Sequence, residues 1–455
     1  MEKPVIVPEL DPGFLPAALW NRRYRELAAR KPSHPLAVTV ERANGAISRF
    51  DTVLLEETEE NAALNLRYVE RLVKFMLWAY GGWHVTVAGG ARVAAELRRI
   101  YSASGARSFD FDVMGRRVYD RPFTVSSVEY ADAPAEKRVA MELGGNLKGC
   151  RIGFDLGGSD RKCAAVIDGK AVHSEEVVWD PYFQSDVEYH KAGILDSLRR
   201  AAAKLPRIDA IGGSAAGVYV DNQPRIASLF RGIPEADFAD KVRPIFLEIA
   251  KEFPGVPFTV INDGEVTALA GALSMHRNAL IGLAMGTSEA VGYVTPEGKL
   301  TDYLNELAFA PVDYREENAP RDEWSGDFGV GANYLSQQAV GRLAPLAGFE
   351  FAEGTTLPEQ LKLVQKAMAS GDERAAKIYR SVGVYLGYAV AHYADFYKVE
   401  NLLLLGRVSS GEGGNLIIEE ADKVLKKVFP ELGVSFLLPD ETFKRHGQAV
   451  VAASL

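Results

Sequence analysis

The sequence predicts an α/β protein, because apolar strands and helices alternate over most of its length. The expected strands are short apolar runs: 151–155, 163–168, 208–213, 257–261, 280–285, 289–295 and 401–405. The expected helices lie between or after them: 187–204, 236–252, 333–347, 358–370 and 372–398. This alternation is typical of sheets that are covered by helices.

The composition is that of a globular protein with ample apolar residues for a core. The chain has 455 residues, of which 47% are hydrophobic and 25% charged, and this length corresponds to about two to four domains. A net charge of −9 argues against nucleic-acid binding through bulk charge. No apolar run could span a bilayer, and the N-terminus lacks a secretory pattern. We therefore expect a soluble, cytoplasmic protein with no nucleic-acid or membrane partner.

Residues 1–149 are expected to form an accessory α/β domain. Two strands over 36–55 flank an Asn-Gly turn, a long helix covers 57–80, and a strand at 84–88 leads through Gly-Gly into another helix. Short strands are expected over 106–130. The region lacks the basic excess that binding to a phosphate backbone needs, so we expect it to serve assembly or site closure rather than DNA binding.

The sequence DLGGS, which begins at Asp155, joins two apolar strands and suggests a phosphate-binding hairpin. Gly157 and Gly158 let backbone amides approach an anion closely, because neither residue has a Cβ. Ser159 adds a hydroxyl donor, and Lys162 adds a cation. Asp155 would repel phosphate unless a divalent cation lay between them, which points to a Mg²⁺–nucleotide. The alternative is an ordinary glycine hairpin.

A second candidate site follows the expected strand 257–261, where Asn262 and Asp263 come directly before a helix. At the end of a strand, Asp263 is well placed as a general base that takes a proton from a hydroxyl as its oxygen attacks phosphorus. Asn262 could hold a neighbouring hydroxyl. The alternative is that one of the two residues simply caps the helix.

Two further glycine turns come at strand ends. Gly286, Thr287 and Ser288 offer amides and two hydroxyls to terminal phosphates, although Glu289 beside them is unfavourable for an anion. Gly406 follows the apolar run NLLLL in a glycine-rich stretch on which an adenine or ribose could lie. Each turn alone is also compatible with a plain loop.

The order of these four motifs resembles the superfamily of actin, hexokinase and the heat-shock ATPases, and within it the ROK (repressor, ORF, kinase) sugar kinases. The resemblance covers residues 150–455, and DLGGS is similar to the DLGGT of that family. Asn262 and Asp263 stand where the family has its catalytic base. The segment NELAF stands where the family has Gly-Glu-x-Gly-His, whose glutamate, here Glu306, holds sugar hydroxyls.

The chain also departs from that family. Phe309 replaces the histidine of the Gly-Glu-x-Gly-His segment, and the cysteine-rich zinc segment is missing. With only two cysteines in the chain, no structural zinc of the family's kind is expected. The Gly-Thr-Ser turn and Lys162 look more like the related xylulose and glycerol kinases, and Asp160 is unusual in the hairpin.

One pattern links the N-terminal region to the later part of the chain. A long helix, an apolar strand, a glycine turn and a helix describe both 57–101 and 372–425. Residues 1–149 are therefore either a degenerate actin-like half or a generic α/β arrangement.

The resemblance implies two ribonuclease-H-like, actin-like lobes, 150–275 and 276–455, that close over ATP. It implies an ATP-dependent carbohydrate kinase that transfers the γ-phosphoryl group to a hydroxyl of a sugar or sugar derivative. Asp263 is then the general base, Asp155 holds Mg²⁺, and Asn262 and Glu306 orient the acceptor. The remaining site residues bind ATP and its phosphates: Gly157, Gly158, Ser159, Lys162, Gly286, Thr287, Ser288 and Gly406.

The rival hypothesis is a non-catalytic, sugar-sensing or regulatory protein that keeps the fold. Asp160, Glu289 and the lost histidine favour it, whereas the retained Asp155 and Asp263 oppose it. A second rival is an ATPase that acts on a protein partner. A homo-oligomer is compatible with each hypothesis.

Overall fold

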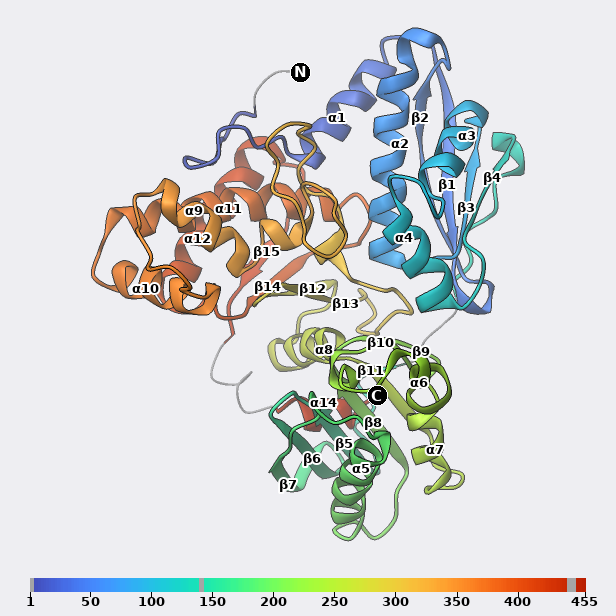
Figure 1. Cartoon of the computed structure of the whole chain (residues 1–455), viewed down its shortest axis with the longest axis vertical. Helices are drawn as coiled ribbons and strands as arrows, with labels where there is room; N and C mark the ends of the chain where they lie inside the picture. The colour runs from blue at the N-terminus through green and yellow to red at the C-terminus, as the bar shows by residue number, and fades with distance from the viewer. Residues whose placement is uncertain (1–3, 139–142, 440–446) are drawn as a thin grey trace. The chain divides into compact units, whose positions relative to one another are not determined.

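The computed structural model describes residues 4–138, 143–439 and 447–455 of the chain (Figure 1). Its contacts form two compact units. Unit 1 comprises Met1–Val139, Leu283–Val291 and Asp302–Leu438, and unit 2 comprises Ala140–Gly282, Gly292–Thr301 and Pro439–Leu455. Within the described residues, the strands form three sheets of four or five strands and one two-stranded ribbon, which confirms the α/β fold class. A search of the described helices finds none with the length and apolar content of a membrane span.

The N-terminal part of unit 1 is a four-stranded sheet with helices packed against it (Figure 1). Its strands, in the spatial order β2-β1-β3-β4, are β1 (Ser33–Glu41), β2 (Ile47–Leu55), β3 (His84–Ala88) and β4 (Thr124–Val128). Its helices are α1 (Ala17–Ala28), α2 (Glu59–Tyr80), α3 (Ala91–Ile100) and α4 (Ser108–Asp112). Strand β1 runs antiparallel to β2 and β3, and β3 runs parallel to β4.

Local signals set the ends of α2 and confirm the helix expected at 57–80. The Thr58 side chain accepts a hydrogen bond from the Asn61 amide, and Gly81 ends the helix with a positive φ of 82°. The short strands expected over 106–130 are wrong for the first part of that range. Residues 108–112 form α4, and 113–119 form a π-helical turn whose apolar side chains are buried at helical spacing.

A second four-stranded sheet, in the order β13-β12-β14-β15, carries the later strands of the chain. They are β12 (Leu280–Met285), β13 (Glu289–Val294), β14 (Asn401–Leu405) and β15 (Ser435–Leu437). The accompanying helices are α9 (Gln337–Leu346), α10 (Leu357–Ala369), α11 (Glu373–Tyr393) and α12 (Glu412–Val428). Helices α11 and α12 pack closely, because Gly383 and Gly387 of α11 leave room for Ile417 and Val424 of α12.

Unit 2 is built on a five-stranded sheet in the order β11-β8-β5-β6-β7. Its strands are β5 (Cys150–Leu156), β6 (Asp160–Ile167), β7 (Lys170–Val178), β8 (Ala210–Ala215) and β11 (Phe258–Asn262). Its longer helices are α5 (Val187–Ala202), α7 (Ile245–Lys251), α8 (Asp263–Met275) and the C-terminal α14 (Gln448–Ala452). Smaller elements are β9 (Val218–Val220), β10 (Gln223–Ile226) and α6 (Glu235–Asp237). Strand β7 was not expected from the sequence, and the helix expected at 236–252 is divided.

The two faces of this sheet are covered differently. Ile152 and Phe154 of β5 pack with residues of α5 and α7 in one apolar core. Gly153 faces the other side, since successive side chains of a strand alternate. A Cβ at Gly153 would lie 1.7 Å from the carbonyl oxygen of Ala449, and one at Gly212 of β8 would lie 1.8 Å from that of Ala452. The backbone of α14 therefore rests directly on the sheet.

The contacts divide the chain differently from the expected segments 1–149, 150–275 and 276–455. Residues 1–139 belong to the same compact unit as 302–438, and 439–455 belong to the unit of 140–282. The N-terminal region is thus grouped with the later lobe, and the last helix, α14, is grouped with the first lobe.

Replacing Gly153 by alanine should lower the free energy of unfolding by ~1–3 kcal/mol, because the added methyl group collides with the α14 backbone. Urea unfolding of Gly153→Ala and wild type measures this. Gly447→Ala is the matched control, because Gly447 precedes α14 with a φ of −56° and no atom of the described residues lies within 4 Å of its Cβ position. Equal unfolding midpoints for Gly153→Ala and wild type would contradict the packing of α14 on this sheet.

Candidate functional site

The predicted site residues fall into two sets, one in each compact unit. Unit 2 contains Asp155, Gly157, Gly158, Ser159, Lys162, Asn262 and Asp263, and unit 1 contains Gly286, Thr287, Ser288, Glu306 and Gly406. Within unit 2 the charge of Asp263 contributes to raising the pKa of Asp155.

Asp155 lies near the end of β5 and is only 5% exposed. The hydroxyl of Ser214, opposite it on β8, donates to its Oδ1 at 2.7 Å. When the Gln448 amide is oriented to satisfy both of its groups, its nitrogen donates to Asp155 Oδ2 at 3.0 Å. Burial raises the pKa of this carboxyl, while the Ser214 hydroxyl and Lys162 oppose the rise. Neutral hydroxyl and amide donors thus hold a buried carboxyl in place.

The donor set around Asp155 suits Mg²⁺ only as part of a nucleotide complex. Within the described ranges no group of three or more His, Cys, Asp or Glu side chains could hold a metal ion. Mg²⁺ is commonly bound by one or two carboxylates together with water and substrate phosphates. Asp155 fits that pattern as the single protein carboxylate.

The turn after β5 already holds an anion, the carboxylate of Asp160. The Ser159 hydroxyl donates to Asp160 Oδ2 at 2.8 Å, and Lys162 Nζ lies 2.9 Å from Oδ1. The Gly157 amide donates to the Asp160 carbonyl at 2.9 Å. Hydrogen bonds from Lys162 and Ser159 hold the pKa of the Asp160 carboxyl below its usual value, so it stays ionised. Three of the donors predicted for phosphate are therefore engaged by Asp160.

An aromatic side chain explains why this turn needs a glycine at position 158. A Cβ at Gly158 would lie 2.1 Å from the Tyr182 hydroxyl oxygen, and the Trp179 indole donates to the Gly157 carbonyl at 2.8 Å. The Arg231 guanidinium lies 3.9 Å from the centre of the Tyr182 ring. Sequence analysis did not identify Arg231, because no spacing or motif links it to a hairpin 70 residues earlier.

Asn262 and Asp263 have different surroundings at the start of α8. The Asn262 side chain accepts from the Gly264 amide at 2.7 Å and donates to the Gly217 carbonyl at 2.7 Å, so it has the capping role that the sequence left open. Burial raises the pKa of the Asp263 carboxyl, while backbone amides lower it. Among the described residues only backbone amides donate to this carboxyl. A carboxyl with a raised pKa and no competing side chain suits a general base.

In unit 1, two of the predicted turns lie side by side. The Gly286 amide donates to the Ser288 carbonyl at 3.0 Å, and the exposed Thr287 and Ser288 form the turn from β12 to β13. Gly406 has a φ of 92°, and a Cβ there would lie 2.5 Å from the carbonyl oxygen of Met285. The ends of β12 and β14 are therefore in contact, and they bring Gly286 and Gly406 together.

Glu289, which looked unfavourable beside a phosphate turn, points into the interior of unit 1. It is 4% exposed, and its Oε1 accepts from the Tyr393 hydroxyl at 2.9 Å. Burial, with a smaller contribution from the nearby Glu306 charge, raises its pKa to about 8. Glu289 is therefore largely protonated at neutral pH and adds little negative charge to the turn.

Glu306 lies at the edge of a buried loop that is tied to the N-terminal region. Its amide donates to the Trp78 carbonyl at 2.9 Å, and its side chain is half-buried. Phe309, which stands in place of the family's histidine, packs on the Trp78 ring with centroids 4.4 Å apart. The phenyl ring offers no hydrogen bond to a sugar, so this position cannot make the polar contact that a histidine would. Sequence analysis did not foresee a role for Trp78.

Comparison with known proteins identifies the fold. No protein-family model and no curated protein sequence matches the chain. A ROK hexokinase from Thermus thermophilus superposes with a TM-score of 0.51 and 18% identity, over 67% of this chain and 96% of that one. A ROK family transcriptional regulator, a homologue of the E. coli MLC protein, also gives a TM-score of 0.51 and 18% identity, over 68% of this chain and 79% of that one. The chain therefore has the ROK fold.

Asp160→Asn should tighten the binding of Mg²⁺–ATP. The substitution removes the carboxylate that engages Ser159 and Lys162, so phosphate no longer has to displace it. Exposed ion pairs of this kind are worth up to ~1 kcal/mol, so we expect the Kd to fall by up to roughly fivefold. Isothermal titration calorimetry measures it, with Glu188→Gln on α5 as a control for charge alone. An unchanged Kd in Asp160→Asn would argue against phosphate binding at this turn.

Glu289→Gln should stabilise the protein increasingly as pH rises. The folded chain holds the Glu289 proton up to its raised pKa of about 8, whereas the unfolded chain releases it near the ordinary glutamate pKa of 4.5. Between these pH values the wild-type free energy of unfolding falls as pH rises, by at most ~1.4 kcal/mol per pH unit from this group. Urea unfolding of both proteins across that range measures the difference. A difference that is constant with pH would refute the assignment.

Proposed function

We propose that this chain, which has the ROK fold, is an ATP-dependent kinase that phosphorylates a hydroxyl of a sugar or sugar derivative. The observation that carries the proposal is Asp263, a carboxyl of raised pKa directly after β11 to which, among the described residues, only backbone amides donate. The presence of a hexokinase among the structures with this fold supports a sugar as the acceptor.

In the proposed reaction, Asp263 accepts the proton of the acceptor hydroxyl as its oxygen bonds to the γ-phosphorus. The bond from that phosphorus to the bridging oxygen breaks, and ADP leaves. Asn262 fixes the start of α8, and thereby the backbone of Asp263. Glu306 orients the acceptor. Asp155 would hold Mg²⁺, which offsets the charge of the phosphates when it is bound.

Each compact unit offers one glycine turn with donors for phosphate. In the first turn, the amides of Gly157, Gly158 and Ser159 and the Lys162 ammonium bind them once Asp160 has turned away. In the second turn, the exposed Thr287 and Ser288 supply hydroxyls. Gly406 is exposed and has no side chain, so the nucleoside can lie against its backbone. The need to displace Asp160 makes this a weaker phosphate turn than one without an acidic residue.

One observation favours a second candidate, a sugar-sensing regulator without catalysis. The Asp160 carboxylate already satisfies the donors of the first turn, as it would in a protein that no longer binds nucleotide. A transcriptional regulator also shares the fold, with the same TM-score as the hexokinase. Sugar binding without ATP turnover would identify this function.

Asp263→Asn should abolish phosphoryl transfer while leaving the fold intact. Loss of a general base costs ~10²–10⁴-fold in rate. The substitution replaces a carboxyl whose charged form is disfavoured by burial with a neutral amide, so folding and nucleotide binding should persist. The measurement is ADP release with hexoses, amino sugars and polyols as acceptors.

The matched control for this variant is Asp186→Asn. Asp186 caps α5, and asparagine caps a helix equally well. Turnover at the wild-type rate in Asp263→Asn would remove Asp263 as the base.

A further inference from the structure

The C-terminal end of α2 holds the backbone of the Glu306 loop. The amides of Leu304, Asn305 and Glu306 donate to three successive carbonyls of α2, those of Tyr80, Ala79 and Trp78, at 3.3, 2.9 and 2.9 Å. The last carbonyls of a helix have no hydrogen-bond partner within the helix, so they can accept hydrogen bonds from backbone amides of another segment. A loop more than 220 residues later in the sequence thus completes α2.

Trp78 contacts this loop a second time, through its side chain. Its ring packs on Phe309, with centroids 4.4 Å apart, and both rings lie within 6.0 Å of Phe109. The indole nitrogen donates to Asp110 Oδ1. One residue of α2 therefore sets the backbone position of Glu306 and the ring position of Phe309, and Asp110 fixes the orientation of its indole.

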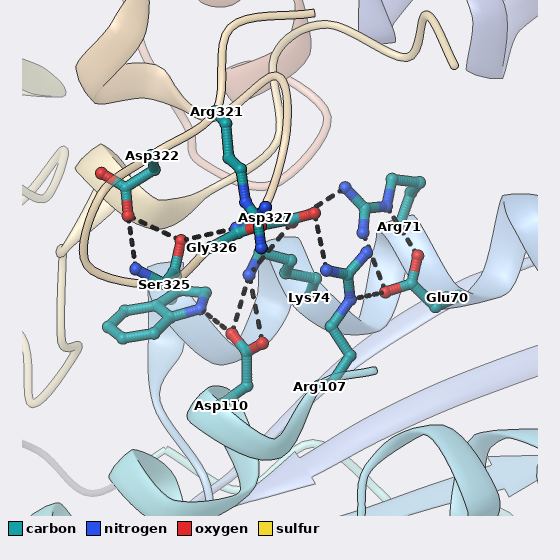
Figure 2. A network of polar contacts seen from close by, with 11 residues as sticks. Glu70, Arg71, Lys74, Arg107, Asp110, Arg321, Asp322, Ser325, Gly326 and Asp327 are labelled. Atoms are coloured by element: carbon teal, nitrogen blue, oxygen red, sulfur yellow. Dashed lines mark hydrogen bonds and ion pairs between the residues drawn. The ribbon is translucent and has the colours of Figure 1, made fainter. Parts of the chain in front are cut away.

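Asp110 is held in turn by a network of charges in the interior of unit 1 (Figure 2). Lys74 Nζ, which is 0% exposed, lies 2.9 Å from Asp110 and 3.2 Å from Asp327. Arg71 and Arg107 also contact Asp327, at 3.1 and 2.6 Å. The charges in this network balance, because three cations pair with three carboxylates: Arg71, Lys74 and Arg107 with Glu70, Asp110 and Asp327. Figure 2 shows how these side chains lie.

This network joins three segments that are distant in sequence: α2, the region around α4, and residues 319–330. Removing one partner from a buried ion pair leaves an uncompensated charge, so such groups strongly favour the one arrangement in which all of them are paired. The network therefore holds α2 in one position against residues 319–330, which follow Glu306 in the sequence. It lies next to Trp78 on α2.

We propose that α2 of the N-terminal region forms part of the acceptor site and that Trp78 is a positioning residue for the acceptor. It acts through Glu306 and Phe309, and Lys74 and Asp110 hold it in place. The inference rests on the proposed function, since it assigns the acceptor to Glu306. It gives residues 1–139 a role in substrate binding rather than that of an independent appendage.

The test is Trp78→Phe, which keeps an aromatic ring and removes the indole N–H that Asp110 accepts. A hydrogen bond to a charged group is strong enough for its loss to raise the acceptor KM by about tenfold. The ATP KM should stay within about twofold of wild type, because the loop that Trp78 contacts carries Glu306 and Phe309, which the proposed function places at the acceptor. Phe309→Leu, which removes the ring from the other side, should raise the acceptor KM in the same way.

Trp20→Phe is the matched control. Trp20 is also buried on a helix of unit 1, but its ring packs on Tyr24, Tyr68 and Tyr314. The same substitution there should leave both KM values unchanged.

Hydrogen–deuterium exchange of the 304–306 amides supplies a readout that does not need turnover. Exchange should accelerate in Trp78→Phe and stay at the wild-type rate in Trp20→Phe. If no acceptor supports turnover in wild type, the proposed function fails, and exchange alone decides whether Trp78 holds the loop. Wild-type exchange in Trp78→Phe, or an equal rise of both KM values, would overturn the inference.

Discussion

A buried ammonium group needs anionic partners, and Lys74 finds them where three distant segments of the chain meet. Asp110 and Asp327 supply those partners, and two arginines balance the remaining charge. This requirement explains why residues 1–139 belong to the same compact unit as 302–438. It also explains the conformation of the loop after β13, because the backbone of Glu306 and the segment around Asp327 are both held by α2. The proposed acceptor site thus depends on a helix near the start of the chain.

The first glycine turn is under a different constraint, which concerns affinity rather than shape. Its Gly158 is needed for packing against Tyr182, whatever the turn binds. Its Ser159 and Lys162 donors are already engaged by Asp160. A phosphate at this turn would therefore gain only the difference between its own interactions and those of Asp160. The packing of this turn is compatible with catalysis by Asp263 and with regulation without catalysis. An activity measurement therefore has to distinguish the two functions.

The sequence was sufficient to predict the α/β class, because strands such as 280–285, and 401–405 after its first residue, are continuous apolar runs. It could not predict α4, since the helical turn there depends on long-range contacts such as the pairing of Asp110 with Lys74. In the candidate site, the position of Asp263 at a strand end was visible from its spacing. The partners of Asp155, Ser214 and Gln448, were not, because strand register and the docking of α14 bring them together.

The central claim is phosphoryl transfer to a sugar hydroxyl, and ³¹P NMR of the reaction products tests it most directly. Wild-type protein is incubated with Mg²⁺–ATP and each of a panel of hexoses, amino sugars and polyols. The account predicts that at least one acceptor gains a phosphomonoester resonance in amounts equal to the ADP formed. Inorganic phosphate as the only product with every acceptor, or ATP that remains intact throughout, would contradict it.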